Sequence, residues 1–261
     1  MSISSLPGGA LRIKRAFKVV QRHFTVYTKL YKSSFALNFL EPILYLAAFG
    51  LGLGNYIQDI KGVPYINYIA PGIIASSSMF AAIYECTYGT YVRMVFQKTF
   101  DAILATPITV DELIAGELLW GAVKSVLYGI TIIIVISLFG LVSSPLILLV
   151  LPVLFISGLI FAEISVIAVA TIPGIDSFNY FYTLLMTPMF LFSGIFFPLD
   201  SMPPIVSQIA FFTPLYHLVN ICRAFASGSV SGVVPDLIWL VAVAGLFAPY
   251  PFRLMRKRII K

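Results

Sequence analysis

Two neighbouring stretches decide the fold: residues 114–140, IAGELLWGAVKSVLYGITIIIVISLFG, and residues 146–171, LILLVLPVLFISGLIFAEISVIAVAT. Each is longer than the roughly 20 apolar residues that an α-helix needs to cross the hydrocarbon core of a bilayer. Ser143, Ser144 and Pro145 separate them and predict a tight turn. We therefore predict two membrane-spanning helices that run in opposite directions.

The rest of the chain has the same apolar character. Of its 261 residues, 59% are hydrophobic and only 11% are charged, and the mean hydropathy is +0.97. A soluble domain is about one quarter charged, and one globular core cannot hide this much apolar surface. The composition therefore excludes a soluble enzyme and predicts an all-α integral membrane protein.

Four more apolar stretches bring the predicted number of membrane spans to six. They lie at about 35–54, 66–92, 178–197 and 235–252. The six spans form one transmembrane domain, 35–252, which a basic tail, 253–261, follows. Before them, residues 1–34 form a separate N-terminal segment. Its apolar and basic positions between 10 and 33 predict an amphipathic helix in the membrane interface, with a disordered basic arm as the alternative.

The distribution of lysine and arginine predicts the topology. Both ends of the chain are basic, which favours two cytoplasmic termini and an even number of spans. The polar segment at about 93–112 then faces the cytoplasm, and the segment at about 198–234 faces outward. The outer loops contain only Lys61 and Arg223 as basic residues, in agreement with this orientation.

The outer segment is unusual because residues 203–225 are too apolar for a plain solvated loop. Pro203, Pro204 and Pro214 interrupt the stretch. This pattern predicts a re-entrant region of two short helices that dip into the outer leaflet, since irregular backbone is not tolerated in lipid. A seventh span is the alternative, but it would place the basic tail outside the cell.

Motifs for chemistry within the chain are missing. The nearest approach to a phosphate-binding loop is residues 116–121, which Ala122 follows where lysine is required. His23 and His217 are far apart in sequence, and no zinc-ligand spacing is present. We predict no catalytic, cofactor-binding or metal-binding residue in this chain. Nucleic-acid binding is also disfavoured, because no soluble domain carries the positive charge.

Several charged residues fall inside the predicted spans: Glu41, Glu85, Glu117, Lys124 and Glu163. A charge in lipid is costly and implies contact with protein or water. Pairing with a neighbouring helix and a role in transport both fit the pattern.

Aromatic side chains recur at helical spacing along the second predicted span, at Phe80, Tyr84, Tyr88 and Tyr91. Stacked tyrosines can line a path for sugars or amphiphiles, and ordinary packing between helices is the alternative. The fifth predicted span adds further phenylalanines, among them Phe192 and Phe196.

Four stretches, in this order, resemble the membrane permease subunit of type-2 ATP-binding-cassette (ABC) exporters. They are EPILYLAAFGLGLG at 41–54, YIAPGIIASSSMF at 68–80, the loop 93–107 that ends in FDAILATP, and SGIFFPLDSMPPIV with TPLYHLVNICRAF between 193 and 225. Within that family the strings are most similar to permeases that export nodulation factors and other lipo-oligosaccharides.

The resemblance implies an export permease in the cytoplasmic (inner) membrane. It would act as a homodimer, or a pair of like permeases, with two copies of a separate ATPase that binds ATP and magnesium. The cargo would be an amphiphile, a glycan, a lipo-oligosaccharide or a drug. An ion-coupled secondary transporter or a channel is the alternative, but no convincing internal repeat supports it.

The resemblance also implies roles for individual residues. The N-terminal interfacial helix and the loop at about 94–106 would contact the ATPase. The coupling candidates are Arg93, Lys98, Phe100, Asp101 and Pro107. The candidates for the lining of the translocation path are Phe80, Tyr84, Glu85, Tyr88, Tyr91, Phe192 and Phe196.

Overall fold

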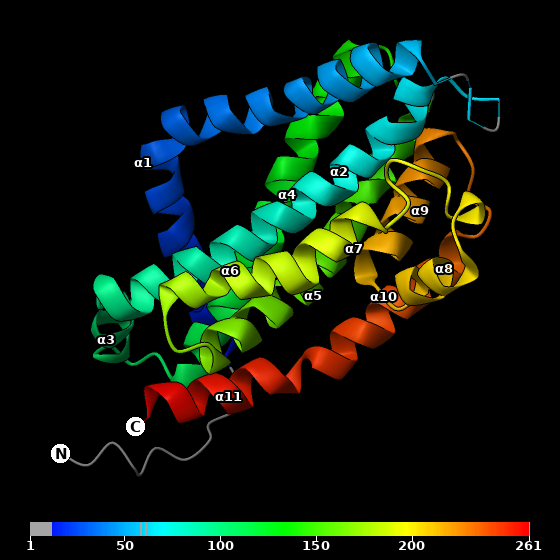
Figure 1. The fold of residues 1–261 in the computed structure, drawn as a ribbon. Coiled ribbons are helices and arrows are strands. Elements are labelled where there is room, and N and C mark those ends of the chain that lie inside the picture. Colours follow the sequence, from blue (N-terminus) through cyan, green and yellow to red (C-terminus); the bar gives the residue numbers. More distant parts are fainter. Residues whose placement is uncertain (1–11, 58, 61, 143, 261) are drawn as a thin grey trace.

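The computed structural model describes residues 12–57, 59–60, 62–142 and 144–260. Helices dominate these residues, and the one β-type pairing among them is an isolated antiparallel bridge between Ile60 and Val63. The prediction of an all-α fold is confirmed. Figure 1 shows the long helices running side by side, between an end that holds α3 and the C-terminus and an end that holds α8 and α9. These are called the α3 end and the α8 end below.

Four helical segments are long and apolar enough to cross a membrane: Tyr65–Phe96, Val110–Leu138, Pro145–Thr171 and Val233–Ile259. The first consists of α2 (Tyr65–Tyr84) and two π-helical stretches after it, and the second is α4 (Val110–Leu138). The third joins a short 3₁₀ turn to α5 (Val150–Thr171), and the fourth joins α10 (Val233–Phe247) to α11 (Pro249–Ile259). They coincide with four of the six predicted spans.

The predicted interfacial helix and the first predicted span both fall in α1 (Ile13–Tyr45) and the short helical turns that follow it. Figure 1 shows that α1 bends between a shorter N-terminal part and a longer part that runs along the bundle. The side chains of residues 30–39, and those of Glu41 and Pro42, lie outside the described residues. The predicted boundary at residue 34 and the first span therefore stay predictions.

The fifth predicted span, 178–197, is shorter in the structure. Its helix consists of α6 (Phe178–Phe181), a π-helical turn and α7 (Thr187–Leu191), in all about 14 residues. That length spans roughly 21 Å, less than the hydrocarbon core. The helix ends before Gly194, which has a φ of +82° that favours glycine. The count of six spans is therefore not confirmed by helix length alone.

The segment that is predicted to face outward contains two short helices, as its prolines predict. They are α8 (Pro204–Phe211) and α9 (Pro214–Ala226), and their axes are bent by 90° at the break. Both begin with proline at the first helical position. The N–H at that position has no acceptor within the helix, so its absence in proline breaks no helical hydrogen bond. If the bent pair counts as one broken span, the described residues hold five candidate spans instead of four.

Local sequence signals set where the central helices begin. Thr109 and Glu112 form a capping box at the start of α4: the Thr109 hydroxyl accepts from the Glu112 N–H, and the Glu112 carboxylate accepts from the Thr109 N–H. At the start of the third span, the Ser144 hydroxyl accepts from the Leu146 N–H, and Pro145 takes the first helical position. These caps satisfy donors that would otherwise be orphaned.

Small residues let α4 and α5 approach closely. A Cβ added at Gly158 of α5 would lie 2.9 Å from the Ala122 Cα and 2.6 Å from the Ser125 Cβ of α4. One at Gly121 would lie 2.8 Å from the Ala162 Cβ. Helices in membranes associate through such close packing because lipid supplies no hydrophobic drive between them. This contact forms the rigid centre on which α1, α2 and α9 pack.

Candidate functional site

The predicted coupling residues divide into exposed and buried ones. Lys98, Asp101 and Pro107 are exposed at the α3 end of the bundle. Phe100 is only 1% exposed, and the Arg93 side chain is 13% exposed and lies toward the interior. The short helix α3 (Thr99–Leu104) therefore presents its polar side outward and holds its aromatic residue in the core.

A tight reversal connects the second predicted span to α3. Lys98 has a φ of +53°, the one positive φ at a non-glycine residue in the described parts of the chain. Such a conformation costs about 1–3 kcal/mol and persists only where the surroundings impose it. Phe100 and Ile103 supply that constraint, because both are buried in one cluster with Leu113 and Ile114 of α4. The segment 97–107, called the α3 segment below, is thus held firmly against α4.

The N-terminal part of α1, residues 13–29, lies against the junction between the α3 segment and α4. We call it the α1 arm. The Arg15 guanidinium donates to the Pro107 carbonyl at 2.6 Å and lies 3.8 Å from the Glu112 carboxylate. Farther along, a Cβ added at Gly116 would meet the Val19 side chain at 2.5 Å. A glycine on α4 thus allows the α1 arm to pack directly on its backbone.

Behind this junction lies a buried charge network of His23, Glu85, Arg93, Glu117 and Lys124. Arg93 is its centre: one guanidinium nitrogen is 2.6 Å from a Glu85 oxygen and the other is 2.6 Å from a Glu117 oxygen. The second Glu117 oxygen is 2.8 Å from Nε2 of His23. The network therefore joins the α1 arm, the second predicted span and α4 by charge-assisted hydrogen bonds.

Lys124 closes the network on its other side. Its ammonium lies 3.5 Å from Glu85 and 4.1 Å from the centre of the Tyr27 ring, with the Trp120 and Tyr128 rings at 5.8 and 5.6 Å. A cation over an aromatic face is attracted by the negative face of the ring. Tyr27 is thus the second residue of the α1 arm, after His23, that contacts the network.

Of this network, sequence reasoning identified Glu85, Glu117 and Lys124 as charges in need of partners, and it left pairing and transport open. Arg93 was assigned to the ATPase surface, a role that stays a prediction, and its guanidinium lies in the network. His23 and Thr90 were missed. Thr90 donates to Glu117 at 2.8 Å. The only feature of the local sequence that could have indicated Thr90 is that it is a polar residue in an apolar span, five residues after Glu85.

Four residues of the predicted aromatic stripe come together with aromatic side chains of the fifth predicted span. We call the set the aromatic band: Phe80, Tyr84, Tyr88, Tyr91, Phe178, Tyr182, Phe190 and Phe196. Neighbouring rings in it have centroids 5.0–6.3 Å apart. It runs from Tyr91 near the α3 end to Phe196 near the α8 end. Tyr182 sits at its middle, stacked on Tyr84 and bonded to Thr87 at 2.7 Å.

Two of the path candidates lie apart from this band. Glu85 belongs to the buried charge network, although it follows Tyr84 directly. Phe192 is 44% exposed, and among the described residues no ring is stacked on it. Tyr84 is 52% exposed, so the band is open to the surroundings of the chain at its middle. Phe178 and Tyr182 were not predicted, because their contact with the second span depends on how the helices pack.

At the α8 end, Arg223 of α9 holds the chain after α7. Its guanidinium donates to the carbonyls of Gly194 at 2.5 Å and Ile195 at 3.1 Å, and its carbon lies 3.9 Å from the centre of the Tyr68 ring. His217 of α9 lies 2.6 Å from Asp236 of α10. These contacts tie α9 to α2 and to the last span.

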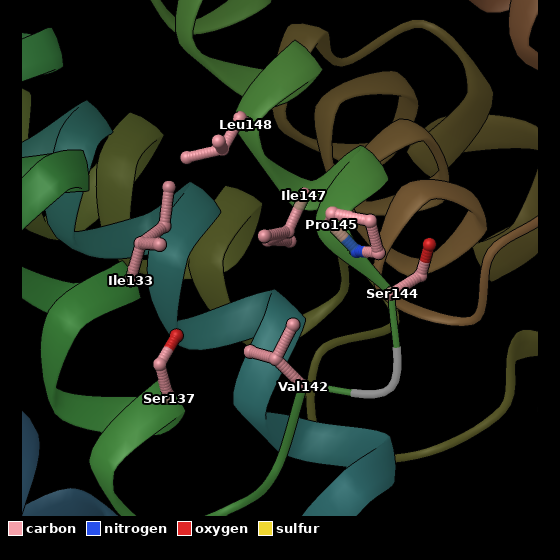
Figure 2. Close-up of a pocket in the computed structure, with 7 residues that line it drawn as sticks. All are labelled: Ile133, Ser137, Val142, Ser144, Pro145, Ile147 and Leu148. Carbon is pink, nitrogen blue, oxygen red and sulfur yellow. The ribbon is translucent and has the colours of Figure 1, made fainter.

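A pocket of about 370 Å³ lies at the connection between α4 and α5. Figure 2 shows its lining residues, which come from the end of α4 and from the turn into the next helix: Ile133, Ser137, Val142, Ser144, Pro145, Ile147 and Leu148. It shares no residue with the aromatic band or with the buried charge network. Both of those sites are made by side chains in mutual contact.

Comparison with known proteins identifies the family of this chain. The family model described as ABC-2 type transporter matches residues 16–225. The chain belongs to the ABC-2 type transporter family. Nodulation protein J of Rhizobium leguminosarum bv. viciae is 33% identical to it over 100% of both chains. Nodulation protein J of Rhizobium meliloti (strain 1021) is 34% identical over 81% of this chain and 80% of its own. Inner membrane transport permease YadH of Escherichia coli (strain K12) is 23% identical over 68% of this chain and 69% of its own.

This ABC-2 protein is therefore a multi-pass membrane permease, the transport subunit of an ABC exporter. Permease subunits of the ABC-2 family lack a nucleotide-binding domain of their own. Residues 116–121, the nearest approach to a phosphate-binding loop in the sequence, lie within α4.

Proposed function

We propose that this permease pairs with a second like copy, and that two copies of a separate ATPase drive it with ATP and magnesium bound to the ATPase. The observation that carries the proposal is the position of the α1 arm. The arm contacts the α3 segment through Arg15 and is part of the buried charge network through His23. A force applied to the exposed face of α3 would reach α4 through Arg15 and His23, and the second predicted span through Arg93. An ATP-driven change works only through contacts that differ between the two states.

The proposed topology has six spans in the inner membrane with both termini in the cytoplasm. The longer part of α1 would be the first span and α6 with α7 the short fifth one. The α8–α9 pair would then be the outer re-entrant region. Basic residues concentrated on the α1 arm and on α11 support the cytoplasmic position of the α3 end. The test is labelling of single cysteines by a membrane-impermeant reagent from either side. Labelling of the α3 segment only from outside would overturn this orientation.

Co-purification tests the ATPase partner. The tagged chain is extracted from its native membranes in mild detergent, and its partners and ATP hydrolysis are measured. We expect a stoichiometric chain with a phosphate-binding loop and hydrolysis that needs both chains. A permease that purifies alone and shows no hydrolysis in detergent or in lipid would contradict the proposal.

The exposed face of α3 is the proposed ATPase contact. Asp101→Asn is expected to weaken ATPase binding about tenfold, which corresponds to a loss of about 1.4 kcal/mol of binding free energy. It should change the free energy of unfolding by less than about 0.5 kcal/mol, because Asp101 is exposed. Phe100→Ala should instead cost about 3–5 kcal/mol of folding stability, because Phe100 is buried.

The control for Asp101→Asn is Asp59→Asn, the same change at an exposed residue in the loop before α2. Binding is measured by titrating the purified ATPase onto the permease in nanodiscs, and stability by thermal unfolding. Equal ATPase affinities for the two variants would remove Asp101 from the contact.

The aromatic band is the proposed translocation surface for an amphiphile, and the similarity to nodulation protein J favours a lipo-oligosaccharide. Aromatic faces stack on sugar rings and also accept acyl chains. Tyr84 is the central candidate because it is half exposed and stacks on Tyr182.

Tyr84→Ala is expected to slow ATP-driven transport of a fluorescent lipo-oligosaccharide into inverted vesicles roughly fivefold, since one aromatic stacking contact contributes about 1 kcal/mol. The matched control is Tyr180→Ala, a tyrosine that is 71% exposed and lies outside the band. If both variants transport at the same rate, the band is packing between helices and not the path.

A further inference from the structure

The α1 arm has three faces, and only one of them is covered. The covered face packs on α4 and carries Ala16, Val19 and His23, which are 1%, 1% and 4% exposed. The other two faces are an apolar one and a basic one. Because a helix turns once in 3.6 residues, these faces follow directly from the order of residues along the arm.

The apolar face consists of Ile13, Phe17 and Phe24, which follow one another at helical spacing. They are 71%, 62% and 47% exposed. Two phenylalanines and an isoleucine side by side on a helix surface are costly to leave in water. They mark a face that is covered by something apolar.

The basic face consists of Lys14, Lys18, Arg22 and Lys29, all exposed. Lys18 donates to the Gln21 side chain at 3.2 Å. In the part of the chain that the structure describes, none of the four forms an ion pair. Residues 12–29 contain six lysines and arginines and not one aspartate or glutamate. The face therefore carries uncompensated positive charge.

We propose that the α1 arm is a binding site for anionic phospholipids. The apolar face enters the acyl-chain boundary, and the basic face holds the negatively charged headgroups. This combination of exposed aromatic and aliphatic side chains beside a row of cations is what an interfacial helix presents to an anionic leaflet. Charge attraction alone would leave the exposed phenylalanines without an apolar environment, which the acyl-chain boundary supplies.

The bound lipid would act on transport through contacts that are already in place. The same arm carries His23, bonded to Glu117, and Arg15, bonded to the Pro107 carbonyl. Lipid that stabilises the arm against α4 therefore stabilises the buried charge network as well. The anionic content of the membrane would set how readily the arm moves. This inference rests on the predicted position of the arm in the membrane interface and on the proposed cytoplasmic side of the α3 end.

Hydrogen–deuterium exchange of the full-length permease tests it. The chain is placed in detergent, in nanodiscs of phosphatidylcholine, and in nanodiscs of phosphatidylcholine and phosphatidylglycerol at about 7 to 3. We expect amide exchange in residues 13–29 to slow at least tenfold with phosphatidylglycerol relative to phosphatidylcholine, because binding to the folded arm opposes its opening. Salt at about 0.5 M should reverse most of the effect.

The test variant is Lys14→Gln/Lys18→Gln/Arg22→Gln, which removes three charges from the arm without altering its covered face. It should lose most of the response, since each charge contributes about fivefold in affinity for an anionic surface. The control is Arg253→Gln/Lys257→Gln, which removes exposed charges from α11. A control that loses the response as fully as the test variant would overturn the assignment to the arm.

The remaining outcomes separate this inference from the proposals on which it depends. Slower exchange in both lipids than in detergent, with no difference between the lipids, places the arm in the interface but overturns the anionic site. Equal exchange in all three conditions overturns the interfacial position too. Slowing that appears only when the purified ATPase is added would make the ATPase the occupant of the basic face and would also overturn the inference.

Discussion

Glu117→Gln is expected to lower the free energy of unfolding by about 3 kcal/mol or more, because it removes one partner of a buried ion pair. The Glu117 carboxylate accepts from Arg93 and Thr90 and faces His23, and its side chain is 2% exposed. Glutamine has only one acceptor oxygen, and its NH₂ group would face one of the donors that the carboxylate now accepts from. Thermal unfolding in nanodiscs should show a midpoint roughly 5–10 °C lower.

Glu163→Gln provides the matched control. Glu163 is 5% exposed, and its Oε2 has no hydrogen-bond partner among the described residues. An isolated buried carboxylate is costly, so the neutral amide should leave stability unchanged or raise it. If both substitutions lower the unfolding midpoint equally, the loss at Glu117 does not come from the network.

A double-mutant cycle isolates the bond between the α1 arm and α4. His23→Gln and Glu117→Gln are measured singly and together. Residues in one hydrogen-bonded network have interaction energies of about 0.5–3 kcal/mol, so the two losses should fall short of additivity by that amount. Additive losses would mean that His23 and Glu117 do not stabilise one another. The arm would then be held by its other contacts, the Arg15 hydrogen bond, the packing at Gly116 and the Tyr27 ring under Lys124.

Gly158→Val is the second substitution with a large expected effect. The new Cβ would lie 2.9 Å from the Ala122 backbone, which cannot rotate away as a side chain can. Forcing α4 and α5 apart should cost about 3 kcal/mol or more, the upper part of the range for overpacked cores. The measurement is the folded fraction after size-exclusion chromatography, together with the unfolding midpoint.

Gly245→Val is the control, because a Cβ at Gly245 of α10 meets nothing within 4 Å. It should fold in nearly normal amounts. Similar yields of folded protein for the two valine variants would mean that α4 and α5 do not pack as closely as the structure has them.

The sequence predicts the long central helices well. The stretches at 66–92, 114–140, 146–171 and 235–252 each match a helix that is long enough to span a membrane. The two short outer helices follow from their prolines. These features are local, because hydropathy and proline positions act within one segment of the chain. The length of the fifth span was harder to predict, because its helix ends at Leu191 after a π-helical turn that no feature of the sequence indicates.

The candidate site was predicted only in part, because its partners lie far apart in the sequence. Arg93 and Glu117 are 24 residues apart, and His23 and Glu117 are 94 apart. Helical spacing relates residues within one helix and says nothing about which helix faces which. The same holds for Tyr182, whose place in the aromatic band depends on the packing of the fifth span against the second.

By itself, then, the sequence determined that this protein is helical, lies in a membrane and resembles an ABC-2 permease, since composition, hydropathy and ordered motifs are properties of the chain alone. Only the tertiary structure decided that the charges of three helices form one buried network and that the α1 arm contacts it. The physical reason is that a charge in an apolar surrounding needs a partner. The sequence shows which charged residues need a partner. Only close packing of the helices, as between Gly116 and Val19, brings the partner residues within contact distance.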